Sequence, residues 1–287
     1  MNRIQPQRFR AILHDGFALC LILCLTAVLV LLQDCSQPSD PVFNNPNDSL
    51  AGTFTPPEIT ITQSPADGST WPQRHTFFAW TGNSTAALYS FKLDSAAWSP
   101  WDAAKSVDFE SLDDDVHVFQ VKAQHTNASN ETEPLRRTFT IDLLPHPSFF
   151  IVPNLTRPKV GDHFLLYLRV KNIDLLMTMS TALSYGGSIF TVDAVDVVEA
   201  FLEKNHGTIV AFTSNDQNAG RIDANLGVAV GVPKGVQGTG NLLRLTCRAL
   251  SVGSDSLTIR MDSTVVRDTS NVPVSIAGYA NGRVIVQ

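Results

Sequence analysis

The stretch His163-Phe-Leu-Leu-Tyr-Leu-Arg-Val170 is a short apolar run of the kind that forms a buried β-strand. Six further stretches between residues 148 and 287 have the character of strands, and glycine-rich segments separate them. Only Asp196–Lys204, with its apolar residues on one side, indicates a helical turn. About nine strands in this region predict a jelly-roll β-sandwich. The six stretches are Met177–Tyr185, Thr208–Thr213, Arg221–Val230, Asn241–Leu250, Ser256–Met261 and Arg283–Gln287.

A second all-β region precedes this one. Two prolines in Leu144-Pro145-His146-Pro147 interrupt strand-like sequence on both sides, so we expect a domain boundary there. Between residues 58 and 145 apolar and polar residues alternate, as in Glu58–Thr62 and Val116–Ala123, and no stretch holds a helical period. About seven strands with turn signals between them predict an immunoglobulin-like sandwich over 58–145, followed by the jelly roll over 148–287. The predicted fold class is all-β, with an apolar helix at the N-terminus.

Residues 1–35 are predicted to be a signal peptide or a membrane anchor. Three arginines precede the apolar run Phe17–Leu32, and this order exports whatever follows the run. The length of the run lies between that of a cleaved signal and that of a spanning helix. Leu32-Gln-Asp-Cys35 resembles a bacterial lipobox, which implies lipidation of Cys35. A lipid on Cys35, an uncleaved helix and a cleaved signal stay open, and each places the following residues in the cell envelope or at the extracellular surface.

The composition narrows the classes of partner. Ser36–Pro57 contains five prolines and no Lys or Arg, which is typical of a semi-rigid linker. The chain of 287 residues has a net charge of −6, which argues against nucleic acid as its main partner. Cys247 is the only cysteine after residue 35, so the two sandwiches must be held together by hydrophobic cores rather than by disulfides.

An ordered set of short motifs covers residues 148–287. The set comprises Lys159–Phe164, Val170–Ile173, Leu183–Tyr185, Phe190–Asp193, Phe201-Leu202, Gly220–Ile222, Gly238–Leu245, Gly253–Leu257 and Gly282–Val286. In order and spacing these motifs resemble a cohesin domain, the receptor module for dockerins in cellulosomes and related surface assemblies. The chain departs from the family at Tyr185-Gly186, where Tyr-Asp-Pro is usual.

The cohesin resemblance implies a docking surface and a partner. In that family the dockerin, which carries its own calcium, docks on one sheet that includes the third strand. The family's polar contact positions on that strand match Thr178 and Ser180 of this chain. The period-2 alternation of a strand directs Thr178 and Ser180 outward and Met179 and Leu183 inward. Thr178 and Ser180 are therefore the predicted partner-binding residues, and ordinary exposed strand positions are the alternative.

The first region has a resemblance of its own. Phe91–Asp94, Trp98-Ser-Pro-Trp101, His117–Ala123 and Arg137–Asp142 resemble the bacterial immunoglobulin or fibronectin type III-like modules of surface proteins, which are commonly spacers. Two tryptophans also suggest a platform on which sugar rings stack. Because residues three apart on a strand point to opposite faces, we expect the two rings to be a core and rim pair instead.

The sequence provides no set of residues for catalysis. It contains no motif of the serine-hydrolase, zinc-protease or phosphate-loop kind, and no dockerin-type calcium loop. His117 and His125 are expected to be a solvent-exposed pair, and Asp113-Asp114-Asp115 a solvated turn. A group of four carboxylates is interpreted as the wet edge of a helix rather than a glycosidase pair: Asp193, Asp196, Glu199 and Glu203. No catalytic residue, metal site or cofactor is predicted.

These observations predict a non-enzymatic, envelope-anchored protein that displays a cohesin-like module on an immunoglobulin-like spacer. The expected partner is a dockerin-bearing protein such as a polysaccharide-degrading enzyme, and the N-terminal segment is expected to contact the membrane. Recognition of a polysaccharide is the alternative function. A row of exposed aromatic residues would favour that alternative, but residues 148–287 contain no Trp and only Tyr167, Tyr185 and Tyr279.

Overall fold

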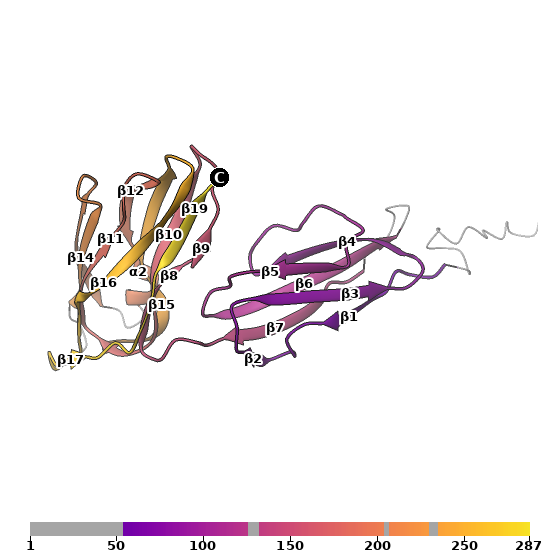
Figure 1. Cartoon of the computed structure of the whole chain (residues 1–287). Coiled ribbons are helices and arrows are strands. Elements are labelled where there is room, and N and C mark those ends of the chain that lie inside the picture. Colours follow the sequence, from indigo (N-terminus) through magenta and orange to yellow (C-terminus); the bar gives the residue numbers. More distant parts are fainter. Residues whose placement is uncertain (1–53, 126–131, 204–206, 230–234) are drawn as a thin grey trace, which may run out of the picture. The chain divides into compact units, whose positions relative to one another are not determined.

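The computed structural model describes residues 54–125, 132–203, 207–229 and 235–287 (Figure 1). Pro57–Gln287 forms a compact unit separate from Met1–Pro56. The predicted N-terminal helix, Cys35 and most of the predicted linker lie outside the described residues. In the part of the chain that the structure describes, no helix has both the length and the apolar character needed to cross a membrane. Nearly all regular structure that the model describes is β, so the predicted fold class is confirmed.

The first sandwich has seven strands in two sheets, as predicted. One sheet has the order β1-β3-β5 and the other the order β2-β7-β6-β4. The core between them is aromatic: the rings of Phe78 and Phe119 stack with their centroids 3.9 Å apart, and Trp80 packs beside Phe119. The strands are β1 Ile59–Gln63, β2 Ser69–Trp71, β3 Thr76–Gly82, β4 Ala86–Leu93, β5 Ser106–Phe109, β6 Val116–His125 and β7 Leu135–Ile141.

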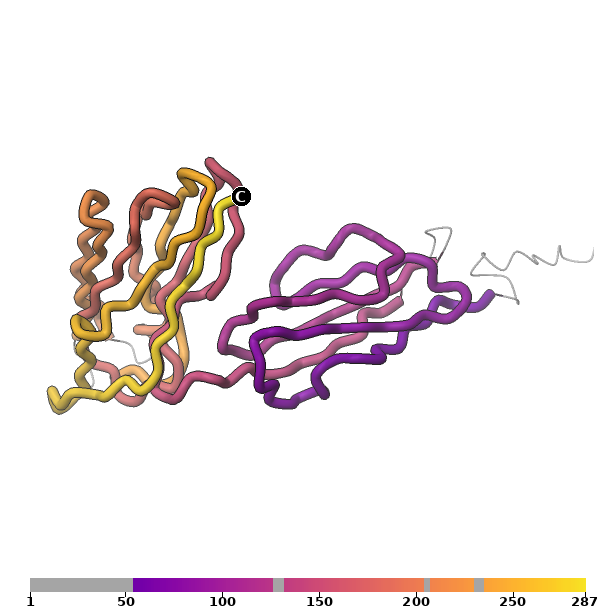
Figure 2. Tube along the Cα trace, in the orientation of Figure 1, coloured from indigo at the N-terminus to yellow at the C-terminus, as the bar shows by residue number. Residues whose placement is uncertain are grey.

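The second sandwich has a five-stranded and a seven-stranded sheet. Their orders are β12-β15-β10-β8-β18 and β13-β14-β11-β16-β19-β9, with β17 paired to β16 (Figures 1 and 2). Nine of its strands have five or more residues, as the sequence predicted. The elements are β8 Ser148–Val152, β9 Leu155–Thr156, β10 His163–Leu176, β11 Thr178–Ser184, β12 Phe190–Val197, α2 Glu199–Leu202, β13 Thr208–Asp216, β14 Arg221–Ala229, β15 Val236–Ala249, β16 Gly253–Arg267, β17 Pro273–Val274, β18 Gly278–Ala280 and β19 Gly282–Val286.

The core of the second sandwich is formed by the inward residues of strands in which apolar and polar side chains alternate. Every second residue of β14 is buried, from Ile222 to Val228, and the residues between them face solvent. Burying an aliphatic side chain of this size contributes about 1.5–3 kcal/mol. The predicted helical turn is α2, which buries Phe201 and Leu202. Gly240 lies under it, and a Cβ there would come within 2.3 Å of the Phe201 ring.

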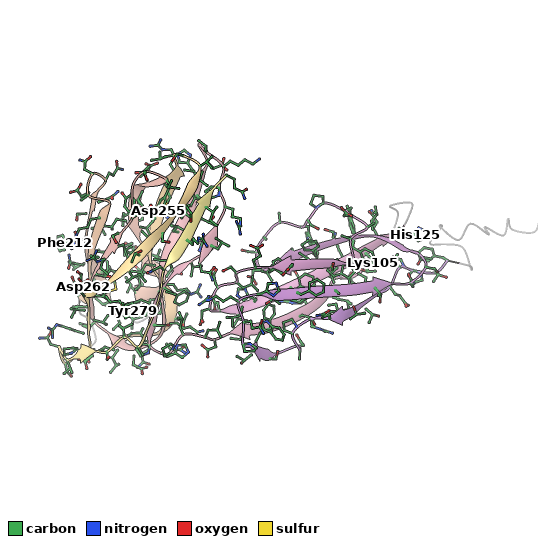
Figure 3. All side chains as sticks on the ribbon, in the orientation of Figure 1. Lys105, His125, Phe212, Asp255, Asp262 and Tyr279 are labelled. Carbon is green, nitrogen blue, oxygen red and sulfur yellow. The ribbon has the colours of Figure 1, made fainter. Side chains whose placement is uncertain are left out.

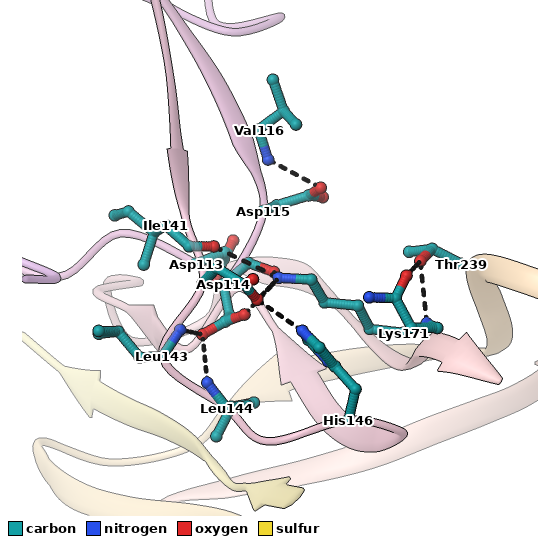
Figure 4. Close-up of polar contacts among 12 residues, drawn as sticks. Asp113, Asp114, Asp115, Val116, Ile141, Leu143, Leu144, His146, Lys171 and Thr239 are labelled. Atoms are coloured by element: carbon teal, nitrogen blue, oxygen red, sulfur yellow. Dashed lines mark hydrogen bonds and ion pairs between the residues drawn. The ribbon is translucent and has the colours of Figure 1, made fainter. Parts of the chain in front are cut away.

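The acidic turn at residues 113–115 is not solvated, so that expectation is wrong. Asp114 is fully buried, and one of its carboxylate oxygens accepts hydrogen bonds from the backbone N–H groups of Leu143 and Leu144 (Figure 4). Its other oxygen forms an ion pair with the Lys171 ammonium on β10. Asp115 pairs with Arg169 of the same strand at 2.7 Å. The turn therefore bonds to the second sandwich instead of to water.

Candidate protein-binding surface

The outer face of strands β13, β14, β11 and β16 carries an ordered grid of side chains. Because the four strands are antiparallel and in register, residues that face one another across the strands form rows. The first row is Val210, Gly227, Thr178 and Arg267, and the second is Phe212, Asn225, Ser180 and Val265. We call these eight residues the docking face.

Exposed apolar side chains flank the docking face, on β13 and on β16, and the small and polar residues of β14 and β11 lie between them. The exposed fractions are 70% for Phe212, 44% for Val210 and 43% for Val265. Phe212 is labelled on this sheet in Figure 3. The face is hollowed by a shallow depression of about 350 Å³, lined by the eight residues together with Met179 and Leu226. Gly227 contributes to the hollow because it has no side chain between Val210 and Thr178.

Charged residues border the docking face on one side. The third row of the grid contains Asp223 and Arg260. Asp223 accepts hydrogen bonds from the guanidinium of Arg221, with a shortest distance of 2.6 Å, and these bonds lower the pKa of the Asp223 carboxyl. Arg260 similarly pairs with Asp262 at 3.5 Å. Exposed apolar side chains next to polar and charged groups are common in protein-binding interfaces.

The predicted partner-binding residues lie on this face. Thr178 and Ser180 are exposed on β11, whereas Met179 and Leu183 are buried, so the side chains alternate as expected. Their role in partner contact stays a prediction. The sequence analysis missed Val210 and Phe212: it predicted a strand at Thr208–Thr213, but it did not place that strand beside β14.

Trp98 and Trp101 of the first sandwich lie on the same side, contrary to expectation. The ammonium of Lys122 lies 4.9 Å from the ring centroids of both Trp98 and Trp101. The rule of alternation fails because both residues are in a loop, which follows β4 and is held by Ser99 N–H donating to the Phe91 carbonyl. Lysine ammonium groups therefore occupy ring faces that a sugar would need.

The predicted exposed histidine pair is also wrong, because His117 and His125 are both buried. The His117 ring donates from Nδ1 to Asp94 Oδ2 at 2.8 Å and from Nε2 to the Asp113 carbonyl at 2.9 Å. Both partners are acceptors, so the arrangement fits a protonated ring. Burial disfavours the charge, but the bonds to Asp94 and Asp113 outweigh it and raise the pKa of His117. The imidazole therefore holds the acidic turn in place.

Two of the four carboxylates near the predicted helix, Asp193 and Asp196, are paired in the structure. Asp193 and Asp196 form ion pairs with Arg248 and Arg244, at 3.1 and 3.0 Å, on the surface of β12 and β15. Burial raises the pKa of the Cys247 thiol to about 12, which keeps it out of the reactive thiolate form. Within the described residues, no three His, Cys, Asp or Glu side chains converge in a way that could hold a metal ion.

No protein-family model matches the chain, and no curated protein matches it. Solved structures do match about half of it. The matching structures include cohesin domains. A non-cellulosomal cohesin from the archaeon Archaeoglobus fulgidus is 16% identical, with a TM-score of 0.40, over 50% of this chain and 92% of that chain. A type II cohesin from Acetivibrio cellulolyticus is 14% identical, with a TM-score of 0.42, over 49% and 95%.

A third cohesin is solved in complex with a dockerin. The Coh-OlpC–Doc435 complex from Clostridium thermocellum is 14% identical, with a TM-score of 0.40, and it covers 49% of this chain and 92% of that chain. These three solved structures are cohesins, the family that the sequence motifs of residues 148–287 resemble.

Proposed function

We propose that residues 148–287 are a cohesin-type module that binds a dockerin-bearing protein on the docking face. The observation that carries this proposal is the exposure of Phe212, Val210 and Val265 on either side of the hydroxyl groups of Thr178 and Ser180. Affinity in protein interfaces depends on a few large anchors that are surrounded by a polar rim. Phe212 is the expected anchor because it is the largest of the exposed side chains on this face.

The chemistry of the docking face defines what the partner presents. The hollow above Gly227 accepts a small apolar side chain. The hydroxyl groups of Thr178 and Ser180 and the amide of Asn225 can each donate and accept hydrogen bonds. The guanidinium of Arg267 at the corner of the first row suits a carboxylate. A helix with small apolar and hydroxyl residues and an acidic group at one end fits this surface, and the partner carries the calcium.

The proposed action is binding without catalysis. Arg267 is the only ionisable side chain of the docking face, which contains no His, Asp, Glu, Lys, Cys or Tyr. Acid–base catalysis needs a group that gains and loses a proton near neutral pH, so this face provides none. Polysaccharide binding has less support, since Phe212 is the only aromatic side chain among the large apolar residues that are exposed in the described part of 148–287.

We also propose that the protein is exported and works at the cell envelope. The support is the arginine-flanked apolar run of residues 1–35 and the linker after it. If Cys35 is lipidated, the Cys35→Ala variant leaves the membrane fraction, whereas a spanning helix keeps the variant there. Recovery of the unaltered protein only in the cytoplasm would contradict export.

Direct titration tests the docking proposal. Residues 57–287, which form a compact unit, are titrated by calorimetry with the calcium-loaded dockerins of the solved complexes, Doc435 among them. We expect at least one dockerin to bind, and Phe212→Ser to weaken it by about tenfold or more. Val252→Ser is the matched control, because Val252 is 71% exposed in a turn away from the docking face. Absence of binding across the dockerins contradicts the assignment of the partner.

A further inference from the structure

Strand β13 is an open sheet edge. In the described part of the chain it pairs with β14 on one side and with no strand on the other. The other edges of the second sandwich are protected: β12 carries two aspartates and a bulge, and β9 and β18 have two and three residues. By contrast, β13 has nine residues, no proline, and no charge before Asp216. Long uncharged edges of this kind are templates for pairing with another strand.

The register identifies which backbone groups point toward the open edge. The N–H of Val228 on β14 donates to the Met177 carbonyl, so the backbone groups of Val228 point away from β13. Ile209 faces Val228, and in an antiparallel pair both members of such a pair direct their N–H and C=O outward. By alternation Ile209, Ala211 and Thr213 present free donors and acceptors along the edge.

The side chains of the same segment also lack cover. All five residues from Val210 to Ser214 are exposed, which includes those on either face of the strand. Beyond Ser214 the edge is closed, because Asn215 donates from its side-chain nitrogen to the Val192 carbonyl of β12 at 2.7 Å. The open part of the edge is therefore Thr208–Ser214.

We propose that this edge pairs antiparallel with the same edge of a second copy of the chain, with the two-fold axis at Ala211. Ala211 then faces Ala211 of the second copy, and Ile209 faces Thr213, so outward-pointing groups meet and each pair exchanges two hydrogen bonds. Val210 faces Phe212 between them, on both sides of the axis. Aromatic and β-branched residues are favourable cross-strand neighbours.

Charge and size define how strong this dimer is. Each copy has a net charge of −6, but no residue of the pairing segment is charged, so like charges are not brought together. A stable dimer usually buries about 1,200–2,000 Å². Seven residues along one edge bury less than this, so we expect a weak dimer whose population rises with concentration. Pairing extends the seven-stranded sheet sideways and leaves the docking faces open.

Sedimentation velocity on residues 57–287, from micromolar to millimolar concentration, tests the proposal. We expect reversible dimerisation, and Ala211→Pro should weaken it at least tenfold. That variant removes an outward N–H and keeps the bonds between β13 and β14. Val252→Ser is the control for surface exposure. A protein that stays monomeric throughout this range overturns the proposal.

A charge-swap experiment separates edge pairing from misfolding. Ala211→Lys and Ala211→Glu each place like charges opposite each other at the two-fold axis, so each variant alone should be monomeric. An equimolar mixture should associate at least as well as the unaltered protein. Failure of the mixture to associate, or dimers in either variant alone, contradicts the register. These measurements need no dockerin, so their failure would leave the proposed function standing.

Discussion

Gly227 offers the most direct perturbation of the docking face. It lies between Val210 on β13 and Thr178 on β11, and it forms the floor of the hollow. A Cβ at this position would lie 3.8 Å from the Val210 carbonyl oxygen and 3.9 Å from Thr178 Cγ2, both ordinary contact distances. A Cβ therefore fits without displacing its neighbours, and the methyl groups of Gly227→Val are expected to fill the hollow.

The two expected effects of Gly227→Val have opposite signs. Glycine within a strand costs about 0.5–1 kcal/mol relative to alanine, so the variant should be equally or more stable than the unaltered protein. A partner side chain that enters the hollow would meet the new methyl groups, and overpacking costs about 1–3 kcal/mol. Binding should then weaken roughly 5-fold to 150-fold.

Urea unfolding measures the change in stability, and calorimetric titration with the dockerin that binds the unaltered protein measures the change in affinity. Thr246→Val is the control, because it replaces a hydroxyl group by a methyl group at an outward position on β15 in the other sheet. If Gly227→Val binds with unchanged affinity while remaining folded, the partner does not use the hollow, and the assignment of the docking face to the partner is wrong.

Three further predictions concern stability. Asp114→Ala removes the buried partner of Lys171 and the acceptor for Leu143 and Leu144, so it should lower the free energy of unfolding by about 3–5 kcal/mol in urea; a loss below 1 kcal/mol would contradict a buried ion pair. Since the pKa of His117 is raised in the folded state, its stabilising contribution is full below its unfolded pKa of about 6.5 and is lost as the pH rises through the folded pKa. The difference in unfolding free energy between the unaltered protein and His117→Gln should therefore shrink toward alkaline pH, and a difference that grows would refute the protonated ring. Gly240→Ala drives a methyl group into the Phe201 ring and should cost about 1–3 kcal/mol, as thermal unfolding would show.

Alternation made most of the strands predictable. In β14 each buried residue is apolar and its neighbours are mostly polar or small, so the sequence Arg221–Val230 predicts both the strand and its inward face. The same reasoning placed Thr178 and Ser180 outward on β11. It failed for Trp98 and Trp101 because it assumed a strand where the chain forms a loop.

Contacts between distant segments were not predictable from one sequence. The environment of Asp114 depends on Lys171, which is 57 residues away. Three adjacent carboxylates predict a solvated turn when the cations that lie beside them in the fold are not known. Periodicity does not identify which loops contact one another. The position of Phe212 was not predictable for the same reason, since its exposure follows from its place on the outer face of the last strand of its sheet.

The stability of the sandwich does not explain why residues 210 and 212 are large and apolar. Burying such side chains would contribute about 1.5–3 kcal/mol each, and here much of that free energy is not gained, because both are exposed on the outer face of an edge strand. Threonine or serine, which occupy the neighbouring outward positions Thr208 and Ser214, would serve the β13–β14 ladder as well. The core therefore places no demand for apolar residues at these two positions. The free energy of burying Phe212 and Val210 is gained only when another chain covers these side chains, on the docking face, along the β13 edge, or at both.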